Sequence, residues 1–268
     1  MYARHLPGDT PGYPDAVDAP RHLERIDWRP ARPPADPPDL SRWPFTIPAV
    51  AQLIEDGGVE IPPGVTFIVG ENGSGKSTLV EAFAAVYPRH GFASAQLDHL
   101  GPGESREDSP LRYHIRARTH PQASPAGFFL RAEAMHAYFG RLDADPMQAR
   151  AFGGERMSER SHGESFLAVL RHRLANVGVY FMDEPEAPFS FRSCLALLAL
   201  LDQMRAEGSQ VIVATHSPML VPLPGAALIE VGEWGMRRVQ RYDELDVVES
   251  WRGFMADPGR YLRHLLSG

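Results

Sequence analysis

Continuous apolar runs alternate with amphipathic segments along the chain, and this pattern predicts both strands and helices. The runs VTFIV (65–69), VGVYFM (177–182) and QVIVAT (210–215) are short and mainly apolar, which is typical of strands buried on both faces of a sheet. Amphipathic helices are expected from residue 77 to Pro88, over 166–175 and over 194–208. Strands that alternate with helices predict an α/β fold with a mainly parallel central sheet.

The segments around this core have a different composition. Residues 1–42 are rich in proline and predict an extended N-terminal arm, in which HLERIDW (22–28) is the candidate strand. One domain is expected over 43–268, with a helical and irregular insert at about 89–160. Within this insert the alternating run LRYHIRART (111–119) predicts an exposed strand. A small antiparallel β part is expected in addition to the main sheet. Residues 226–268 predict a β-hairpin followed by two helices.

Composition and charge exclude several classes of protein. The 268 residues carry a formal net charge of −7, so a protein-wide attraction to nucleic acid or to an anionic membrane is not expected. The single cysteine, Cys194, excludes a disulfide framework and a thiolate metal cluster, and a reducing cytoplasm is the simplest location. No apolar run approaches the roughly 20 residues that cross a bilayer, so direct membrane insertion is not expected.

A phosphate-binding loop follows the first buried strand. Residues 70–78 read GENGSGKST and satisfy the pattern GxxxxGK[ST] between a predicted strand and a predicted helix. Backbone N–H groups of such a loop surround a phosphate, and its lysine reaches the β- and γ-phosphates of a nucleotide. The residues expected to bind ATP are Gly70, Glu71, Asn72, Gly73, Ser74, Gly75, Lys76, Ser77 and Thr78. Ser77 is also a candidate ligand of Mg²⁺.

Two carboxylates end the next buried run, which reads VYFMDEPE. Charged groups at the carboxyl end of a buried strand need a cation or a chemical role. We expect Asp183 to hold Mg²⁺ and Glu184 to act as the base that polarises the attacking water. Lys76 is expected to assist catalysis by stabilising charge on the transferring phosphoryl group.

A histidine follows the third buried run, which reads VIVATHSP. Gly70, Asp183 and His216 thus stand at the carboxyl ends of separate strands, where open α/β sheets bind their ligands. His216 is expected to bond the γ-phosphate or the attacking water, while a purely structural role is the alternative.

The segment SHGES (161–165) precedes an amphipathic helix and lies about 20 residues before Asp183. Taken alone it is an ordinary helix N-cap. Taken with the other motifs, its order and spacing resemble the ATP-binding-cassette (ABC) ATPases, in which a signature loop precedes the Asp-Glu strand and a histidine follows it. The resemblance covers residues 65–218 and is strongest with compact soluble members that are often labelled AAA-domain ATPases.

This resemblance implies a P-loop NTPase three-layer fold and an ATPase that uses ATP and Mg²⁺. It also implies an ATP-dependent homodimer, in which Ser161, Gly163 and Glu164 of one copy bind the γ-phosphate held by the other. The sequence departs from the family pattern at Arg160, His162 and Glu164 in this loop and at Ser190 after the Asp-Glu strand.

Some roles stay open at this point. Gln122 and Glu133 are alternatives for the family's metal-binding glutamine, and Trp43 and Phe45 are alternatives for the aromatic residue that stacks on adenine. Three uses of ATP are weighed: work on DNA, for which only Arg112–Arg118 offers a basic segment, service as a transporter's ATP-binding subunit, and nucleotide-gated capture of a soluble protein partner.

Overall fold

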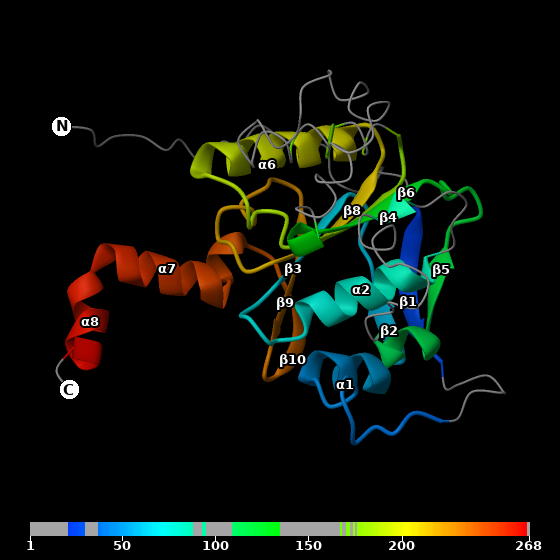
Figure 1. Ribbon diagram of the computed structural model, residues 1–268, viewed down its shortest axis with the longest axis horizontal. Coiled ribbons are helices and arrows are strands. Elements are labelled where there is room, and N and C mark those ends of the chain that lie inside the picture. The colour runs from blue at the N-terminus through cyan, green and yellow to red at the C-terminus, as the bar shows by residue number, and fades with distance from the viewer. Residues whose placement is uncertain are drawn as a thin grey trace.

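A seven-stranded sheet forms the centre of the molecule. The computed structural model describes residues 21–29, 37–87, 93–94, 109–134 and 176–266, together with residues 167, 170, 171 and 174. The strand order is β10-β9-β3-β8-β7-β6-β4, and all neighbours are parallel except the hairpin β9–β10 (Figure 1). These strands are β3 (Val65–Val69), β4 (Ala93–Ser94), β6 (Gly127–Arg131), β7 (Val179–Asp183), β8 (Gln210–Thr215), β9 (Ala227–Gly232) and β10 (Gly235–Val239).

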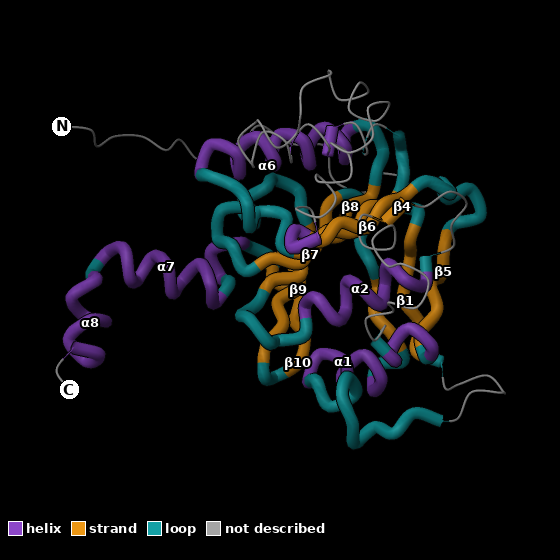
Figure 2. Tube along the Cα trace, in the orientation of Figure 1, coloured by secondary structure: helices purple, strands orange, loops and turns teal. Residues whose placement is uncertain are grey.

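Helices cover both faces of this sheet. Helix α6 (Phe191–Ala206) lies on one face, and α2 (Lys76–Val86) lies on the other, with α1 (Pro48–Glu55) beside the hairpin (Figure 2). Strand β3 shows how one strand serves two cores. Its residues Val65, Phe67 and Val69 face α6, and Ile68 faces α2. This alternation explains why the run VTFIV has no polar face.

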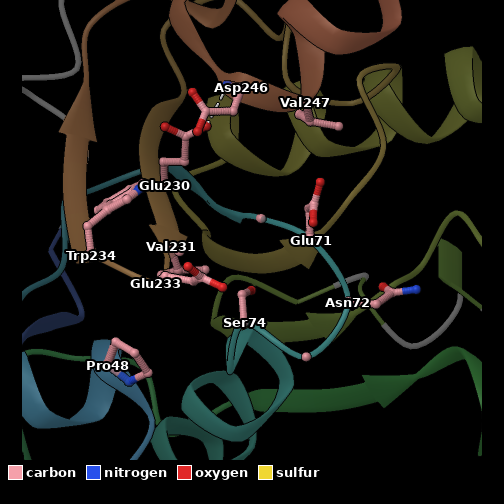
Figure 3. Close-up of a pocket in the computed structure, with 13 residues that line it drawn as sticks. Pro48, Glu71, Asn72, Ser74, Glu230, Val231, Glu233, Trp234, Asp246 and Val247 are labelled. Atoms are coloured by element: carbon pink, nitrogen blue, oxygen red, sulfur yellow. Dashed lines mark hydrogen bonds between the residues drawn. The ribbon is translucent and has the colours of Figure 1, made fainter. Parts of the chain in front are cut away.

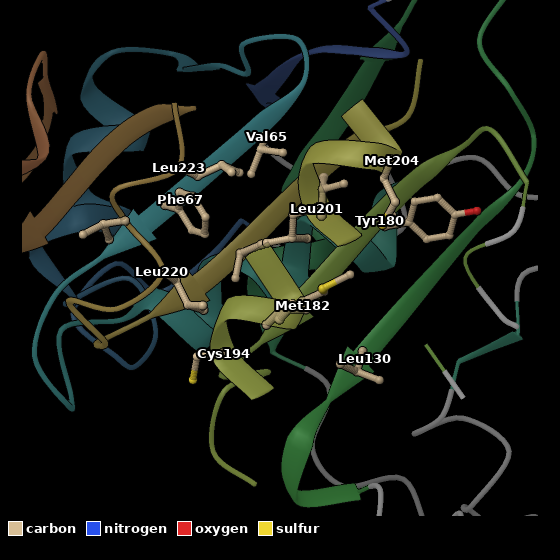
Figure 4. Packing of buried hydrophobic residues seen from close by; sticks show 14 of the residues in the cluster. Val65, Phe67, Leu130, Tyr180, Met182, Cys194, Leu201, Met204, Leu220 and Leu223 are labelled. Carbon is tan, nitrogen blue, oxygen red and sulfur yellow. The ribbon is translucent and has the colours of Figure 1, made fainter. Parts of the chain in front are cut away.

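The core beneath α6 fixes the position of the sheet edge at which β7 and β8 end. Leu201 and Met204 of α6 contact the same buried cluster as Phe67 and Tyr180 of the sheet (Figure 4). The helix begins at Phe191, and Ser190 before it is the N-cap. The hydroxyl oxygen of Ser190 accepts a hydrogen bond from the backbone N–H of Ser193, which satisfies one free donor. Because α6 follows β7 directly, its packing holds the end of that strand in place.

A separate antiparallel sheet lies beside the main one. It contains β2 (Gly58–Glu60), β1 (Leu23–Trp28) and β5 (Ile115–Thr119), in the order β2-β1-β5. Gln210 at the start of β8 connects the two sheets, because its buried amide accepts from the backbone N–H groups of His22 and Leu23. The same amide donates to the carbonyl oxygens of Leu23 and Pro62.

Short helices and a C-terminal arm complete the described chain. The 3-10 helices are η3 (Pro110–Tyr113), η4 (Ala132–Ala134) and η6 (Tyr242–Glu244). Helices α7 (Asp246–Ala256) and α8 (Pro258–Leu266) extend away from the sheet. Over the described residues, no helix combines the length and the apolar character that crossing a bilayer requires.

The pattern of hydrophobic positions predicts most of these elements correctly. The mainly parallel sheet, the antiparallel part, the strand within residues 22–28 and the C-terminal hairpin with its two helices are confirmed. The strand expected from residue 111 begins instead at Ile115, because Pro110 starts a 3-10 turn. Most of the expected insert lies outside the described residues, and the division of the chain near residue 42 stays a prediction.

The amide of Gln210 provides a test of how the two sheets are held together. Gln210→Ala should lower the free energy of unfolding by ~2–4 kcal/mol, because it leaves several buried backbone groups without partners. Urea denaturation followed by circular dichroism measures the change. Gln203→Ala is the control, since Gln203 is exposed on α6 and bonds Glu207. A loss for Gln210→Ala no larger than that of the control contradicts this role.

Candidate active site

The loop between β3 and α2 has the backbone that a phosphate site needs. Gly75 has φ +97°, and a Cβ there would lie 2.5 Å from Cγ2 of Ile47. A Cβ on Gly70 would lie 2.3 Å from the carbonyl oxygen of Val231 on the neighbouring strand. Both positions therefore exclude larger residues, and the loop turns directly into the positive end of α2.

Lys76 is buried at the base of this loop, with 3% of its surface exposed. Its Nζ donates to the carbonyl oxygen of Glu71 at 2.8 Å. Burial lowers the pKa of the ammonium group, while the carboxylates of Glu184 and Asp183 raise it. Lys76 is also the only lysine in the chain. All other Lys or Arg positions of the chain are arginine, so the compact ammonium group of a lysine is found at this position alone.

Ser77 and Asp183 meet across the site. The Ser77 hydroxyl donates to Oδ1 of Asp183 at 2.8 Å, although the two residues are 106 positions apart in the sequence. Asp183 is buried, and burial raises the pKa of its carboxyl group, while the Ser77 bond and the charge of Arg131 lower it. A serine hydroxyl and a carboxylate are hard oxygen donors of the kind that Mg²⁺ takes.

Glu184 has a strained backbone and faces His216. Its φ is +48°, the left-handed region that a residue with a Cβ rarely adopts, and its N–H donates to the carbonyl oxygen of Ala214 on β8. The carboxylate Oε1 lies 3.0 Å from Nδ1 of His216. Both side chains are partly exposed, at 31% and 45%. The carboxylate is therefore positioned by its neighbour strand and still reaches solvent.

Glu186 links the segments that follow β7 and β8. It is buried, and its Oε1 accepts a hydrogen bond from the hydroxyl of Thr215, the last residue of β8. The Thr215 oxygen in turn accepts from the backbone N–H of Ser217. The two residues thus hold the loop that carries His216 against the loop that carries Glu184.

Arg131 is a charged residue of the site that the motifs do not indicate. It ends β6 opposite Asp183, and its Nη2 lies 2.9 Å from Oε2 of Glu81 on α2. Its Nε lies 3.4 Å from Oδ2 of Asp183. Its position in the sequence could have indicated a place in the site, because Arg131 comes directly after an apolar run, as Asp183 does.

Several of these groups line a cavity of about 530 Å³ beside the loop. Its polar lining includes Lys76, Ser77, Arg131, Glu133, Asp183 and Glu184. Of the two candidates for the family's glutamine position, Glu133 lines the cavity, whereas Gln122 is an exposed turn residue outside its lining. Of the two candidate aromatic residues, Trp43 lines the cavity, and Phe45 is buried against Trp28 and His114.

A second cavity of about 430 Å³ lies on the other side of the loop (Figure 3). The hairpin β9–β10 supplies Glu230, Glu233 and Trp234, and Asp246 of α7 also lines it. Glu230 is paired with Arg237 and accepts from the N–H of Asp246. Because its charged lining is acidic, this cavity is a poor place for a triphosphate, and the cavity that contains Lys76 is the better candidate.

The structure brings together the predicted residues that it describes. Gly70 follows β3, Asp183 ends β7 and His216 follows β8, and these three strands are adjacent in the sheet. Glu71, Asn72, Gly73, Ser74 and Thr78 lie in the same loop and helix start, and each lines at least one of the two cavities. Ser161, Gly163 and Glu164 lie outside the described residues, so the expected signature loop stays a prediction.

Several known proteins are similar to this chain in sequence. A family model described as an AAA domain matches residues 50–87. The ribose import ATP-binding protein RbsA of Jannaschia sp. (strain CCS1) is 27% identical over 64% of this chain and 36% of its own length. The cytochrome c biogenesis ATP-binding export protein CcmA of Maricaulis maris (strain MCS10) is 28% identical over 67% of this chain and 85% of its own. The chain thus spans about a third of the first relative.

Solved structures include a cbiO1 from Clostridium perfringens, described as part of the ABC transporter complex cbiONQ. It shares 17% identity over 92% of this chain and 100% of that one, with a TM-score of 0.45.

The buried carboxyl of Glu186 makes stability depend on pH. Burial raises its pKa, although the Thr215 hydroxyl opposes this shift. The folded state therefore keeps the proton over a range in which the unfolded chain has lost it, and the contribution of Glu186 to stability falls as the pH rises through that range. Glu186→Gln should accordingly gain thermal midpoint relative to the parent between about pH 4 and pH 8.

Differential scanning fluorimetry across this pH range measures the effect. Glu249→Gln serves as the control, because Glu249 is exposed on α7. A difference between Glu186→Gln and the parent that shrinks as the pH rises contradicts the assigned direction.

Proposed function

We propose that the chain is a P-loop ATPase of the ABC type, which binds ATP with its phosphates on residues 70–78 and hydrolyses it. One observation carries the proposal. Lys76, Ser77, Asp183, Glu184 and His216 come from three adjacent strand ends and converge on one edge of the sheet. A packing role alone does not explain this set, because its carboxylates border an open cavity.

The residues present fit a magnesium ion. Ser77 and Asp183 supply two hard oxygen atoms 2.8 Å apart, and Mg²⁺ is usually held by one or two carboxylates with substrate phosphates completing the shell. When bound with the nucleotide, this ion offsets charge on the β- and γ-phosphates. Ser77 and Asp183 are therefore the proposed metal ligands.

The remaining roles follow from where each group lies. Lys76 exchanges the carbonyl oxygen of Glu71 for phosphate oxygens, and the N–H groups of the loop and of the α2 N-terminus accept the anion. Glu184 takes a proton from the attacking water, since its carboxylate is accessible and held by His216. In this proposal His216 thereby orients the base, and its partly exposed ring bonds the γ-phosphate or the attacking water.

A second copy of the chain completes the site in this proposal. The cavity is bordered by loop and strand-end residues of one chain. The resemblance to ABC ATPases assigns Ser161, Gly163 and Glu164 of the partner copy to the γ-phosphate. ATP would then hold two copies together until hydrolysis releases them.

The names of the relatives support one of the processes that ATP hydrolysis could drive. The relatives described above carry names of import and export ATP-binding proteins, which favours a transporter's ATP-binding subunit with a membrane partner. A DNA-acting role receives less support, because Arg118 of the basic segment is paired with Asp27. Co-purification with a membrane protein favours the transporter, and salt-dependent DNA binding favours the other role.

Glu184 is the residue whose replacement tests the chemistry. Glu184→Gln should retain ATP binding and lower steady-state hydrolysis at least ~100-fold, the lower end of what a positioned base contributes. Phosphate release measures the rate, and calorimetry measures the affinity. Glu249→Gln is the matched control on the surface of α7. An unchanged rate for Glu184→Gln removes it from the role of base.

The association state tests the second half of the proposal. Glu184→Gln should elute as a monomer without nucleotide and as a dimer with Mg-ATP in size-exclusion chromatography, because ATP stays bound without turnover. The double variant Lys76→Ala, Glu184→Gln should remain a monomer, since the phosphate grip is lost. Elution that does not change with Mg-ATP, for a protein shown to bind ATP, contradicts closure by a second copy.

A further inference from the structure

Arg131 stands between two carboxylates at the proposed metal position. Its guanidinium group is 2.9 Å from Glu81 and 3.4 Å from Asp183, measured at the closest nitrogen and oxygen atoms. Only 15% of the side chain is exposed, so solvent screens these contacts weakly. Glu81 lies one helical turn after Ser77 on α2, which places both on the same face of the helix.

Both oxygens of Asp183 are therefore engaged. Oδ1 accepts from the Ser77 hydroxyl, and Oδ2 faces the Nε of Arg131. The Nε atom is buried and makes only this long ionic contact, without a hydrogen bond. The guanidinium is thus anchored firmly by Glu81 and contacts Asp183 mainly through charge.

The protein alone offers few ligands for a metal at this place. Within the described part of the chain, no three His, Cys, Asp or Glu side chains are grouped so that they could hold an ion. A divalent ion must take its remaining ligands from phosphates and water, as Mg²⁺ commonly does. Binding of metal and binding of nucleotide should therefore be coupled.

We propose, resting on the ATPase function above, that Arg131 is the internal counter-ion of Glu81 and Asp183 and prevents a divalent metal from binding before the nucleotide. Arg131 acts here as a positioning residue. It holds Asp183 with Oδ1 toward Ser77, and its charge repels a metal ion as long as no triphosphate is present. The strongly negative triphosphate then outweighs this repulsion, so the metal arrives with ATP.

The balance of charges determines the sign of the effect. Charges a few ångströms apart in a partly buried site interact by several kcal/mol at an effective dielectric constant of about 20. Loss of the guanidinium removes the cation that both Glu81 and Asp183 contact. Two such carboxylates repel one another and attract a divalent ion, so the empty site should gain affinity for metal.

Manganese binding to the nucleotide-free protein tests this role, because Mn²⁺ takes the same oxygen ligands as Mg²⁺ and is visible by electron paramagnetic resonance. Arg131→Met removes the charge and keeps much of the side-chain length. It should bind Mn²⁺ at least ~10-fold more tightly than the parent. Arg131→Lys keeps the charge and should resemble the parent.

Two further variants separate charge from folding. Glu81→Gln combined with Arg131→Met removes one of the two carboxylates and should return Mn²⁺ affinity toward the parent value. Arg131→Gln, which can still bond Glu81, provides a second neutral variant if Arg131→Met fails to fold. Arg116→Met is the control, since Arg116 is an exposed cation on β5 outside the cavity lining.

The outcomes distinguish this inference from the proposed function. Mn²⁺ affinity that is equal or weaker in the folded neutral variants contradicts the counter-ion role, and so does tighter binding in Arg131→Lys. These measurements contain no nucleotide, so such a result leaves the ATPase proposal standing. A parent protein that binds no ATP contradicts the proposed function, whatever its Mn²⁺ affinity.

Discussion

The parallel register of β3, β8 and β7 is the constraint on which the rest of the site depends. Val69 pairs with Thr215, and Asp183 pairs with Ala214, so the three strands end at one level. Residues that follow these strands must then emerge side by side, although the sequence separates them widely. The two cores above and below the sheet keep that level fixed, because α6 and α2 pack against neighbouring residues of the same strands.

Burial of charge is the main energetic cost at this edge. It raises the pKa of Asp183 and Glu186 and lowers the pKa of Lys76, so each group is pushed toward its neutral form. Opposite charges nearby resist that tendency. The site is therefore a balanced set of charges whose donors and acceptors are already in place, which is the preorganisation that charge-stabilising sites need. The strained backbone at Glu184 fits the same view, since strain concentrates where function requires it.

The helices and strands of this protein can be predicted from its sequence, but the contacts between its charged side chains cannot. Apolar runs and a phosphate motif are local signals, and they place β3, α2, β7 and β8 correctly. The motifs also predict that Gly70, Asp183 and His216 meet, because strand ends follow simple rules in parallel sheets. Arg131 and Glu81 escape such reasoning, since their contact depends on which strand lies beside β7 and on the rotation of α2. The amide of Gln210 escapes it for the same reason, because its partner Leu23 lies in another sheet.

The unique lysine has a practical meaning for chemistry on this protein. Lys76 provides the only side-chain amine among the 268 residues, and it is buried where phosphates are proposed to bind. Reagents that acylate amines therefore meet a single internal target, and a protease specific for lysine has a single internal cleavage position. Covalent labelling and limited digestion thus report directly on whether the loop is open, without any engineered tag or introduced residue.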